Sequence, residues 1–225
     1  MARGDKYGFF SRLFRRRPVV PVVRLSGPIG MNMPLVSSMS LASVGKQLDR
    51  AFAYKKAAAV ALVVNSPGGA PTQSHLIHQR IRQLAEKNKK KVIVFVEDVA
   101  ASGGYMISCA GDEIIADNYS IVGSIGVVSA SFGFEKMLKK LGIERRVYTA
   151  GNSKRQLDAF LPEKPEDIQR LKALQEAIHA DFIALVKKSR GKRLTTNDKT
   201  LFNGEYWLAE QAMKYGLIDG IGDLR

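Results

Sequence analysis

The chain has 225 residues and a mass of 24.8 kDa, the length of one domain or of one domain with a short appendage. Hydrophobic residues make up 45% of it and charged residues 25%, which excludes a mainly disordered chain. A single cysteine, Cys109, excludes an internal disulfide framework, and the three histidines show no metal-ligand spacing. The longest apolar run, Ala57–Val64, is too short to span a bilayer, and no secretory signal pattern is found.

Basic residues dominate the charge: 35 Lys and Arg against 21 Asp and Glu give a formal net charge of +14. Such an excess favours anionic partners, either nucleic acid or an anionic membrane. The basic residues form separate clusters along the chain, at Arg15–Arg17, Lys87–Lys91, Arg145–Arg146 and Lys187–Arg193. No RNA-binding signature with interleaved aromatic residues accompanies them. The sequence therefore predicts solvated basic faces rather than a nucleic-acid partner.

The first 18 residues combine aromatic and basic side chains. The apolar side chains at helical spacing are Phe9, Phe10, Leu13 and Phe14, and the basic side chains among and after them are Arg12 and Arg15–Arg17. A short helix here, ended by Pro18, would suit the surface of an anionic membrane. The alternatives are a frayed tail and a segment that packs on a neighbouring subunit. We therefore predict a basic amphipathic tail at 1–18 and a single domain at 19–225.

From residue 19 onward, segments typical of strands alternate with segments typical of helices. In chain order the sequence predicts a strand at Val19–Leu25, a loop at Ser26–Pro34, a helix at Leu41–Tyr54, a strand at Ala57–Val64, a helix at Thr72–Ala85, a strand at Val92–Val96, a helix at Tyr105–Ala110, strands at Glu113–Ala116 and Val122–Val128, a helix at Glu135–Leu141, a strand at Glu144–Tyr148, a long helix at Pro165–Lys188, and helical pieces at Thr195–Leu201 and Tyr206–Tyr215. This alternation indicates an α/β fold with a mainly parallel sheet, in which sites lie beyond the carboxyl ends of the strands.

Two Gly-Gly turns fall at such strand ends. Ser102 lies in the second one, between a buried strand and a helix start, where a nucleophile would be held beside backbone N–H groups. The simpler interpretation is a helix N-cap. The first turn, Ser66-Pro67-Gly68-Gly69, either offers its N–H groups to an oxyanion or is an ordinary tight turn. Neither turn matches the lipase elbow or the phosphate-loop pattern.

A serine nucleophile needs a base. The three histidines are predicted to lie on helices as surface or packing residues: His75, His78 and His179. The remaining option is a neutral lysine. A free lysine has a pKa of about 10.4, and moving it to near 7 costs about 4.6 kcal/mol, which burial could supply. Most lysines lie in charged runs, whereas Lys154 precedes an apolar-leaning stretch, so Lys154 is a hypothesis for the base.

Five segments together resemble those of the signal peptide peptidase A (protease IV) family of serine peptidases. They are Asn65-Ser66-Pro67-Gly68-Gly69, Ala101-Ser102-Gly103-Gly104-Tyr105, Gly123-Ser124-Ile125-Gly126-Val127, Gly151 to Lys154, and Ala212 to Asp219. Their order and spacing are similar to the family's from about Val19 to the C-terminus. The resemblance implies an α/β fold like that of the Clp protease subunit and the crotonases, built of repeated ββα units with mainly parallel sheets.

The resemblance also implies a Ser/Lys catalytic dyad. Ser102 aligns with the family nucleophile, Lys154 with its general base, and Ser124 with a serine that orients the lysine amine. Gly69 aligns with the oxyanion-hole donor, and the N–H of Gly103 is a second candidate. The implied substrates are remnant signal peptides and other small, apolar-rich peptides. The family further implies a homo-oligomeric ring and a reaction that needs no metal or organic cofactor.

Two features depart from the family's pattern. The membrane anchor common in the family is missing, and the Phe/Arg segment at 1–18 is a candidate replacement. Met106 stands where a second tyrosine is expected, a change that leaves the dyad intact and alters local packing. We therefore expect a cytoplasmic chain or one held peripherally on the cytoplasmic face of the membrane.

Three rival functions stay open at the level of sequence. A crotonase-type acyl-CoA enzyme would need carboxylates near the Gly-Gly turns, for which Glu97 and Asp98 are candidates. A phage-type relative would process capsid or scaffold proteins with the same dyad. A non-catalytic scaffold would bind membranes or nucleic acid through the +14 charge, in a salt-sensitive manner.

Overall fold

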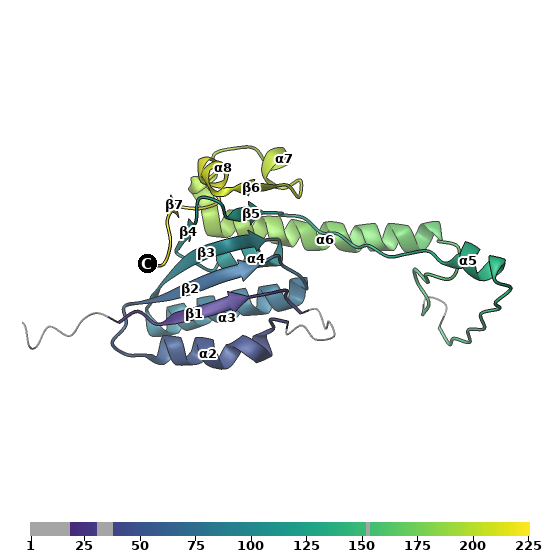
Figure 1. Ribbon diagram of the computed structural model, residues 1–225, viewed down its shortest axis with the longest axis horizontal. Helices are drawn as coiled ribbons and strands as arrows, with labels where there is room; N and C mark the ends of the chain where they lie inside the picture. The colour runs from purple at the N-terminus through teal and green to yellow at the C-terminus, as the bar shows by residue number, and fades with distance from the viewer. Residues whose placement is uncertain (1–18, 31–37, 152–153) are drawn as a thin grey trace, which may run out of the picture.

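A computed structural model describes residues 19–30, 38–151 and 154–225. The predicted tail at 1–18 lies outside these residues, so its amphipathic helix, its membrane attachment and the domain boundary behind it stay predictions. Strands and helices alternate through the described part of the chain (Figure 1). The predicted α/β fold with a mainly parallel sheet is confirmed, because every strand pair but one is parallel.

The sheet has seven strands: β1 (Val22–Ser26), β2 (Ala59–Ser66), β3 (Lys91–Ala101), β4 (Glu113–Ala116), β5 (Ile121–Gly123), β6 (Tyr206–Leu208) and β7 (Gly220–Ile221). Its main order is β1-β2-β3-β4-β7. The long strand β3 has two partners on one edge, since 93–96 pair with β4 and Val99–Ala101 pair with β5. Strand β6 then adds to β5 in the antiparallel sense.

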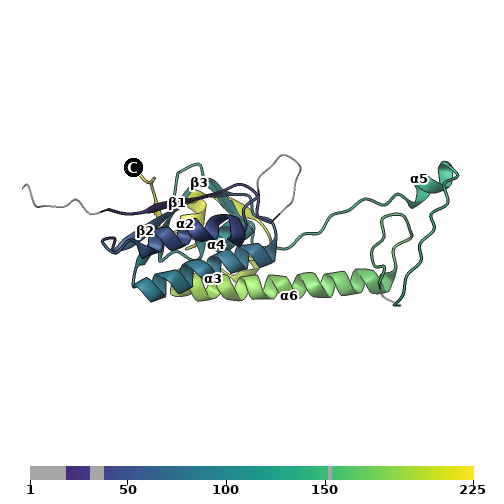
Figure 2. The ribbon, with the colours of Figure 1, turned by 90° about the horizontal axis from the view of Figure 1, so that it is seen from below.

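The helices are α2 (Leu41–Ala53), α3 (Pro71–Asn88), α4 (Gly103–Ser108), α5 (Glu135–Lys140), α6 (Pro165–Arg190), α7 (Asp198–Leu201) and α8 (Ala209–Lys214), with a 3-10 turn at Gly191–Arg193. Figure 2 shows α3 and α6 side by side beneath the sheet, on the same face as α4. Strand β1 shows this one-sided cover, because Val23 and Leu25 are buried while Val22 and Arg24 are exposed.

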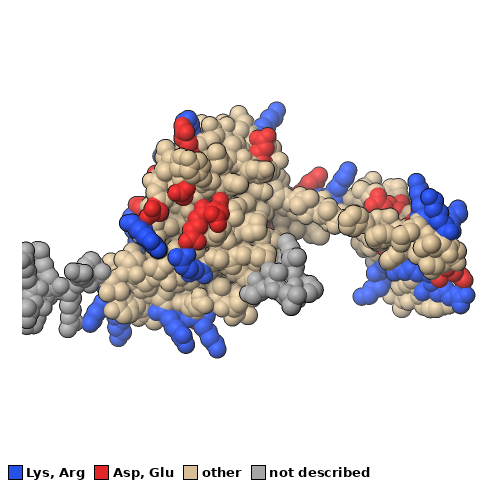
Figure 3. Space-filling model, viewed as in Figure 1, with Lys and Arg blue, Asp and Glu red and all other residues tan. Residues whose placement is uncertain are grey.

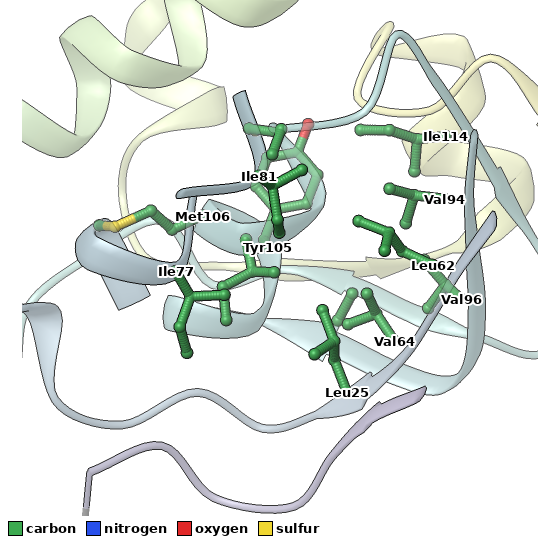
Figure 4. Close-up of a cluster of buried hydrophobic side chains, with 14 of the residues drawn as sticks. Leu25, Leu62, Val64, Ile77, Ile81, Val94, Val96, Tyr105, Met106 and Ile114 are labelled. Carbon is green, nitrogen blue, oxygen red and sulfur yellow. The ribbon is translucent and has the colours of Figure 1, made fainter. Parts of the chain in front are cut away.

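The core lies between the sheet and α2, α3, α4 and α6. Figure 4 shows aliphatic side chains of β2 and β3 meeting Ile77 and Ile81, one helical turn apart on α3. Tyr105 of α4 is fully buried among them, and its hydroxyl donates to the Leu217 carbonyl at 2.7 Å. Beside it, burial raises the pKa of the Cys109 thiol to about 12. The core therefore fixes α4, the helix that follows Ser102, against the sheet.

Three predicted elements differ from the structure. The predicted strand Glu144–Tyr148 is wrong: the segment is exposed and has no partner strand among the described residues. The predicted helix Tyr206–Tyr215 begins as strand β6, because Tyr206–Leu208 pair with β5. The predicted strand Val122–Val128 ends at Gly123, since Ser124 has a φ of 54° that no strand residue adopts.

A long projection extends from the sheet (Figures 1 and 2). Among the described residues it consists of 128–151, which include α5, 154–164, and the N-terminal half of α6. Its apolar side chains are unusually exposed, notably Val128, Phe132, Leu141, Tyr148 and Leu174. In Figure 3, Lys and Arg side chains gather near its end, while on the sheet they are scattered between acidic groups. Among the described residues, no helix is both long enough and apolar enough to cross a membrane.

A buried ion pair closes the C-terminal turn over α6. The Arg190 guanidinium is fully buried and donates two hydrogen bonds to the Asp219 carboxylate, at 2.8 and 2.9 Å. The same carboxylate accepts the Ile114 N–H at 2.8 Å, so α6, β4 and the C-terminal turn meet at one group. Burial opposes the ionisation of Asp219, but the bonds from Arg190, Ile114 and Arg193 outweigh it and lower its pKa.

Replacing Asp219→Asn should lower the free energy of unfolding by about 3 kcal/mol, because it leaves the Arg190 charge buried without its counter-ion. Urea unfolding at pH 7 measures this loss. The pKa of Asp219 lies below its unfolded value of about 3.9. Its stabilising effect is therefore complete above that pH and is lost as the pH falls through the folded pKa, so the variant should lose less stability in acid.

The matched control is Glu210→Gln, which breaks the exposed Lys214–Glu210 ion pair on α8. Exposed pairs contribute little, so this variant should unfold at the wild-type urea concentration. Equal losses in the two variants would contradict a structural role for the buried pair.

Candidate active site

The parallel pairing of β3 with β5 brings Ser102 and Ser124 to the same end of the sheet. Ala101 lies opposite Gly123 in the register, so the two serines leave their strands side by side. The Ser102 N–H donates to the Gly123 carbonyl at 2.8 Å, which fastens the two strand ends together. Two segments more than 20 residues apart in the sequence thus form one wall of a site.

Ser102 occupies a strained backbone position. Its φ of 52° and ψ of −120° lie in a region that side chains avoid and glycine tolerates. It precedes the first turn of α4, yet its side chain makes no capping hydrogen bond. Ser102 therefore stands at the expected N-cap position, where its carbonyl accepts the Met106 N–H at 2.9 Å, but its hydroxyl does not cap the helix. Within the described residues, no partner is found for its hydroxyl, which is the arrangement expected of a nucleophile on a strand-to-helix elbow.

The first Gly-Gly turn packs directly against this elbow. A β-carbon on Gly68 would lie 2.8 Å from the Ser102 β-carbon, and one on Gly69 would lie 2.1 Å from the Ile29 carbonyl oxygen. Both glycines have positive φ, 97° and 146°. Hydrogen bonds from Ile29 to Gly68 and from Ala70 to Ile29 hold the turn, and the Gly69 N–H has no acceptor among the described residues.

The glycines after Ser102 are needed for close packing. A β-carbon on Gly103 would lie 2.2 Å from the Ser74 hydroxyl oxygen, and one on Gly104 would lie 2.4 Å from the Ser66 carbonyl oxygen. Helix α4 can therefore approach α3 and the end of β2 only with glycine at both positions. The Gly103 N–H, like that of Gly69, has no acceptor among the described residues.

Ser124 begins a tight turn on the other side of the elbow. Its φ is 54°, its N–H donates to the Glu205 carbonyl at 2.7 Å, and its carbonyl accepts the Gly126 N–H at 3.0 Å. The turn runs close to the segment before β6, because a β-carbon on Gly126 would lie 3.1 Å from the Gly204 α-carbon. Strand β6 and the residues before it thus fix the position of Ser124.

A cleft of about 840 Å³ lies between these turns, and we call it the Ser102 cleft. Its lining residues are Pro67, Gly68, Gly69, Pro71, Ser102, Ser124, Gly126, Val127, Val128, His179, Asn203 and Gly204. It thus contains three of the residues proposed from the sequence, Ser102, Gly69 and Ser124. Gly103 follows directly behind Ser102 in the chain.

Two polar side chains in the described lining of the Ser102 cleft were not among the candidates from the sequence, those of His179 and Asn203. His179 was expected to be a surface or packing residue, since a histidine on a long helix gives no signal of a distant strand end beside it. His78 does pack between helices: burial first, and then the charges of His75, Arg82 and Lys188, lower its pKa to about 4.

Lys154 does not lie with the other proposed residues. It is exposed, and it belongs to the segment between α5 and α6. Its N–H donates to the Gly151 carbonyl at 3.2 Å, and it does not line the Ser102 cleft. Within one described chain, the candidate nucleophile and the candidate base are therefore separated.

The carboxylates that an acyl-CoA enzyme would require lie elsewhere. Glu97 forms an ion pair with Arg24 at 2.6 Å, and Asp98 accepts from the Asn65 side chain at 2.6 Å. Neither lines the Ser102 cleft, and both border a separate hollow together with the C-terminal residues. In the described part of the chain, no group of three or more His, Cys, Asp or Glu side chains could hold a metal ion.

An α/β fold with a strained serine, glycine N–H groups beside it and an open cleft defines the site class of a serine hydrolase. Comparison with known families agrees, because residues 84–225 match the profile of Peptidase family S49. The chain belongs to this family. The matched residues include the candidate nucleophile Ser102, the turn at Ser124 and Lys154.

Several curated proteins are similar to the chain. The "Serine protease SPPA, chloroplastic" of Arabidopsis thaliana is 31% identical over 92% of this chain, and "Protease 4" of Haemophilus influenzae is 39% identical over 80% of it. A Brucella abortus protein named "Na(+)/H(+) antiporter NhaA" is 59% identical over 97% of the chain. The chain spans only about 30% of the length of these relatives: 30% of the Brucella protein, 31% of the Arabidopsis protein and 29% of the Haemophilus protein.

Replacing Ser102 by glycine should reveal the strain at the elbow. Ser102→Ala keeps a β-carbon at a positive φ, whereas Ser102→Gly removes it. We expect the glycine variant to have a free energy of unfolding about 1 kcal/mol higher than the alanine variant, although glycine is usually the less stable of the two. Urea unfolding of both proteins measures the difference. An alanine variant as stable as the glycine variant would mean that the position is unstrained.

Proposed function

We propose that the chain is a serine endopeptidase with Ser102 as nucleophile and Lys154 as general base. The observation that carries the proposal is the Ser102 elbow in the Ser102 cleft, where neither the Ser102 hydroxyl nor the Gly69 N–H has a hydrogen-bond partner among the described residues. Membership of Peptidase family S49 supports peptide hydrolysis as the reaction. The rival acyl-CoA chemistry lacks support, because the Ser102 cleft has no carboxylate among its described lining residues.

The proposed reaction begins when the neutral Lys154 amine takes the Ser102 proton and the serine oxygen attacks the peptide carbonyl. The Gly69 N–H, with that of Gly103 as a second donor, stabilises the oxyanion of the tetrahedral intermediate. Lys154 then gives its proton to the leaving amine, and the carbon–nitrogen bond breaks. Water, deprotonated by the same amine, hydrolyses the acyl-enzyme and restores Ser102. In this proposal, Ser102, Lys154 and the two glycine N–H groups carry out every step together with water.

The distance between the two dyad residues leads us to propose that the site forms between copies of the chain. Lys154 lies on the projection, and the projection exposes large apolar side chains that favour a protein contact. A neighbouring copy that packs against the projection would bring Lys154 toward a second Ser102 cleft and bury its amine. Burial disfavours the ammonium form and so would supply the neutral base. This arrangement requires a homo-oligomer, in agreement with the expected ring.

We also propose substrates with small or apolar side chains, remnant signal peptides among them. The described lining of the Ser102 cleft includes valines and prolines and no Asp, Glu, Lys or Arg side chain, which suits an apolar peptide. Peripheral attachment to an anionic membrane through Phe9, Phe10, Leu13, Phe14 and Arg15–Arg17 remains a proposal from the sequence. It would place the enzyme where such peptides are released.

The first test is hydrolysis of a panel of fluorogenic peptides with small and apolar residues before the scissile bond. The wild-type chain should cleave several of them, and Ser102→Ala should lower kcat by at least about a thousandfold, because alanine lacks the hydroxyl that attacks the peptide carbonyl. Ser129→Ala, which removes a hydroxyl outside the cleft lining, is the matched control. Equal turnover by wild type and Ser102→Ala would rule out Ser102 as nucleophile.

The second test is complementation between two inactive variants. Ser102→Ala and Lys154→Ala should each be inactive alone. A mixture, dissociated and reassembled together, should regain turnover, because some sites then combine an intact Ser102 with an intact Lys154 from another copy. The control is the same treatment of each variant alone. A mixture without activity would show that the dyad is not shared between copies, and near-wild-type activity of Lys154→Ala alone would remove Lys154 from the mechanism.

The third test is the oligomeric state. Light scattering at working concentration should give a mass of several chains, and Tyr148→Asp together with Phe132→Asp should lower it by placing charges on the exposed apolar surface of the projection. Tyr119→Asp, an exposed aromatic residue away from the projection, controls for charge. A wild-type chain that is strictly monomeric and still active would refute the shared site.

A further inference from the structure

His179 is the one imidazole in the described lining of the Ser102 cleft. It lies on α6, three residues before the buried Phe182 and therefore on the same face of the helix. Packing of Phe182 and Val186 in the core fixes this face. The imidazole thus enters the cleft from a rigid element and not from a loop.

Within the part of the chain that the structure describes, the imidazole has one close polar contact. Its Nε2 atom lies 3.1 Å from the carbonyl oxygen of Ile125. A carbonyl oxygen can only accept a hydrogen bond, so Nε2 must carry a proton and donate it. In the neutral ring this leaves Nδ1 as the unprotonated nitrogen. The nitrogen that a base would use toward Ser102 is therefore not the one held at the Ile125 carbonyl.

The contact acts on the turn that carries Ser124. On one side, the Glu205 carbonyl holds the Ser124 N–H at 2.7 Å, and Gly126 lies against Gly204. On the other side, His179 holds the Ile125 carbonyl, the next polar group along the chain. Without the imidazole, the turn would be held from the β6 side alone, at a residue whose positive φ already costs energy.

We propose that His179 is a positioning residue, which holds the Ser124–Gly126 turn in place so that Ser124 can orient the lysine amine. The inference rests on the proposed function, because it gives Ser124 the role of lysine partner. It adds that α6, the helix that continues into the projection, reaches the catalytic turn through a single hydrogen bond. His179 acts through Ser124 and does not exchange a proton with the substrate.

The test compares His179→Ala with His179→Gln in the full-length assembled protein. Glutamine keeps an N–H donor near the position of Nε2, whereas alanine removes it. We expect His179→Ala to lower kcat about tenfold, the effect of about 1.4 kcal/mol in one hydrogen bond, with KM within about twofold. His179→Gln should stay within about threefold of wild type and keep its pH profile. His75→Ala, which removes an exposed imidazole outside the cleft, should not change activity.

Two results would overturn the proposal. If His179→Gln is as inactive as Ser102→Ala, or loses a limb of the pH profile, the imidazole exchanges protons and is not a positioning residue. If His179→Ala turns over at the wild-type rate, the contact has no role. These outcomes differ from a failure of the proposed function, in which Ser102→Ala and Lys154→Ala would keep activity.

A measurement without substrate completes the test. Nitrogen-15 NMR of the imidazole in the full-length wild-type chain should show His179 in its neutral form as the tautomer with the proton on Nε2, and His75→Ala should leave this signal unchanged. A proton on Nδ1 would contradict the hydrogen bond to Ile125. Thermal unfolding of His179→Ala should stay close to wild type, because a variant that simply unfolds would lose kcat for another reason.

Discussion

The site depends on one pairing, that of the last residues of β3 with β5. Strand β3 continues past the end of β4, and the freed edge at Val99–Ala101 accepts β5 in parallel register. Parallel strands end at the same edge of a sheet, so Ser102 and Ser124 emerge together, both with a φ near 50°. Without this change of partner, β3 would end as an ordinary strand and no second serine would lie beside the elbow.

The close approach of backbones around this pairing explains the density of glycine in the motifs. Gly68, Gly69, Gly103 and Gly104 all lie where a β-carbon would meet backbone or hydroxyl atoms at less than 3 Å. The two Gly-Gly turns are therefore as much a packing requirement as a source of N–H groups. The energy stored at Ser102 is offset by the core behind it, where α4 is buried along its whole length.

The sequence was sufficient to predict what is local. The buried run at Ala57–Val64 and the apolar spacing of α3 and α6 predicted the layers, and the two Gly-Gly turns predicted the end of the sheet at which Ser102 and Gly69 meet. Ser124 was indicated only by the resemblance to a known family. Packing between distant segments was not predictable. The strand expected at Glu144–Tyr148 has the right residue types but no partner among the described residues, and β-structure requires a partner. His179 reaches the cleft only because α6 crosses behind β5, and no spacing pattern in the chain encodes that crossing.

The buried thiol of Cys109 has a practical consequence. It is the single cysteine of the sequence, and burial both shields it and raises its pKa, so that the thiol form dominates at neutral pH. Maleimide dyes react with thiolates, so we expect Cys109 of the native chain to be labelled very slowly. A cysteine introduced on the exposed projection would then be the only site of labelling, without removal of the native one. The fold thus provides a background in which fluorescence energy transfer can test the proposed approach of one copy's projection to the Ser102 cleft of another.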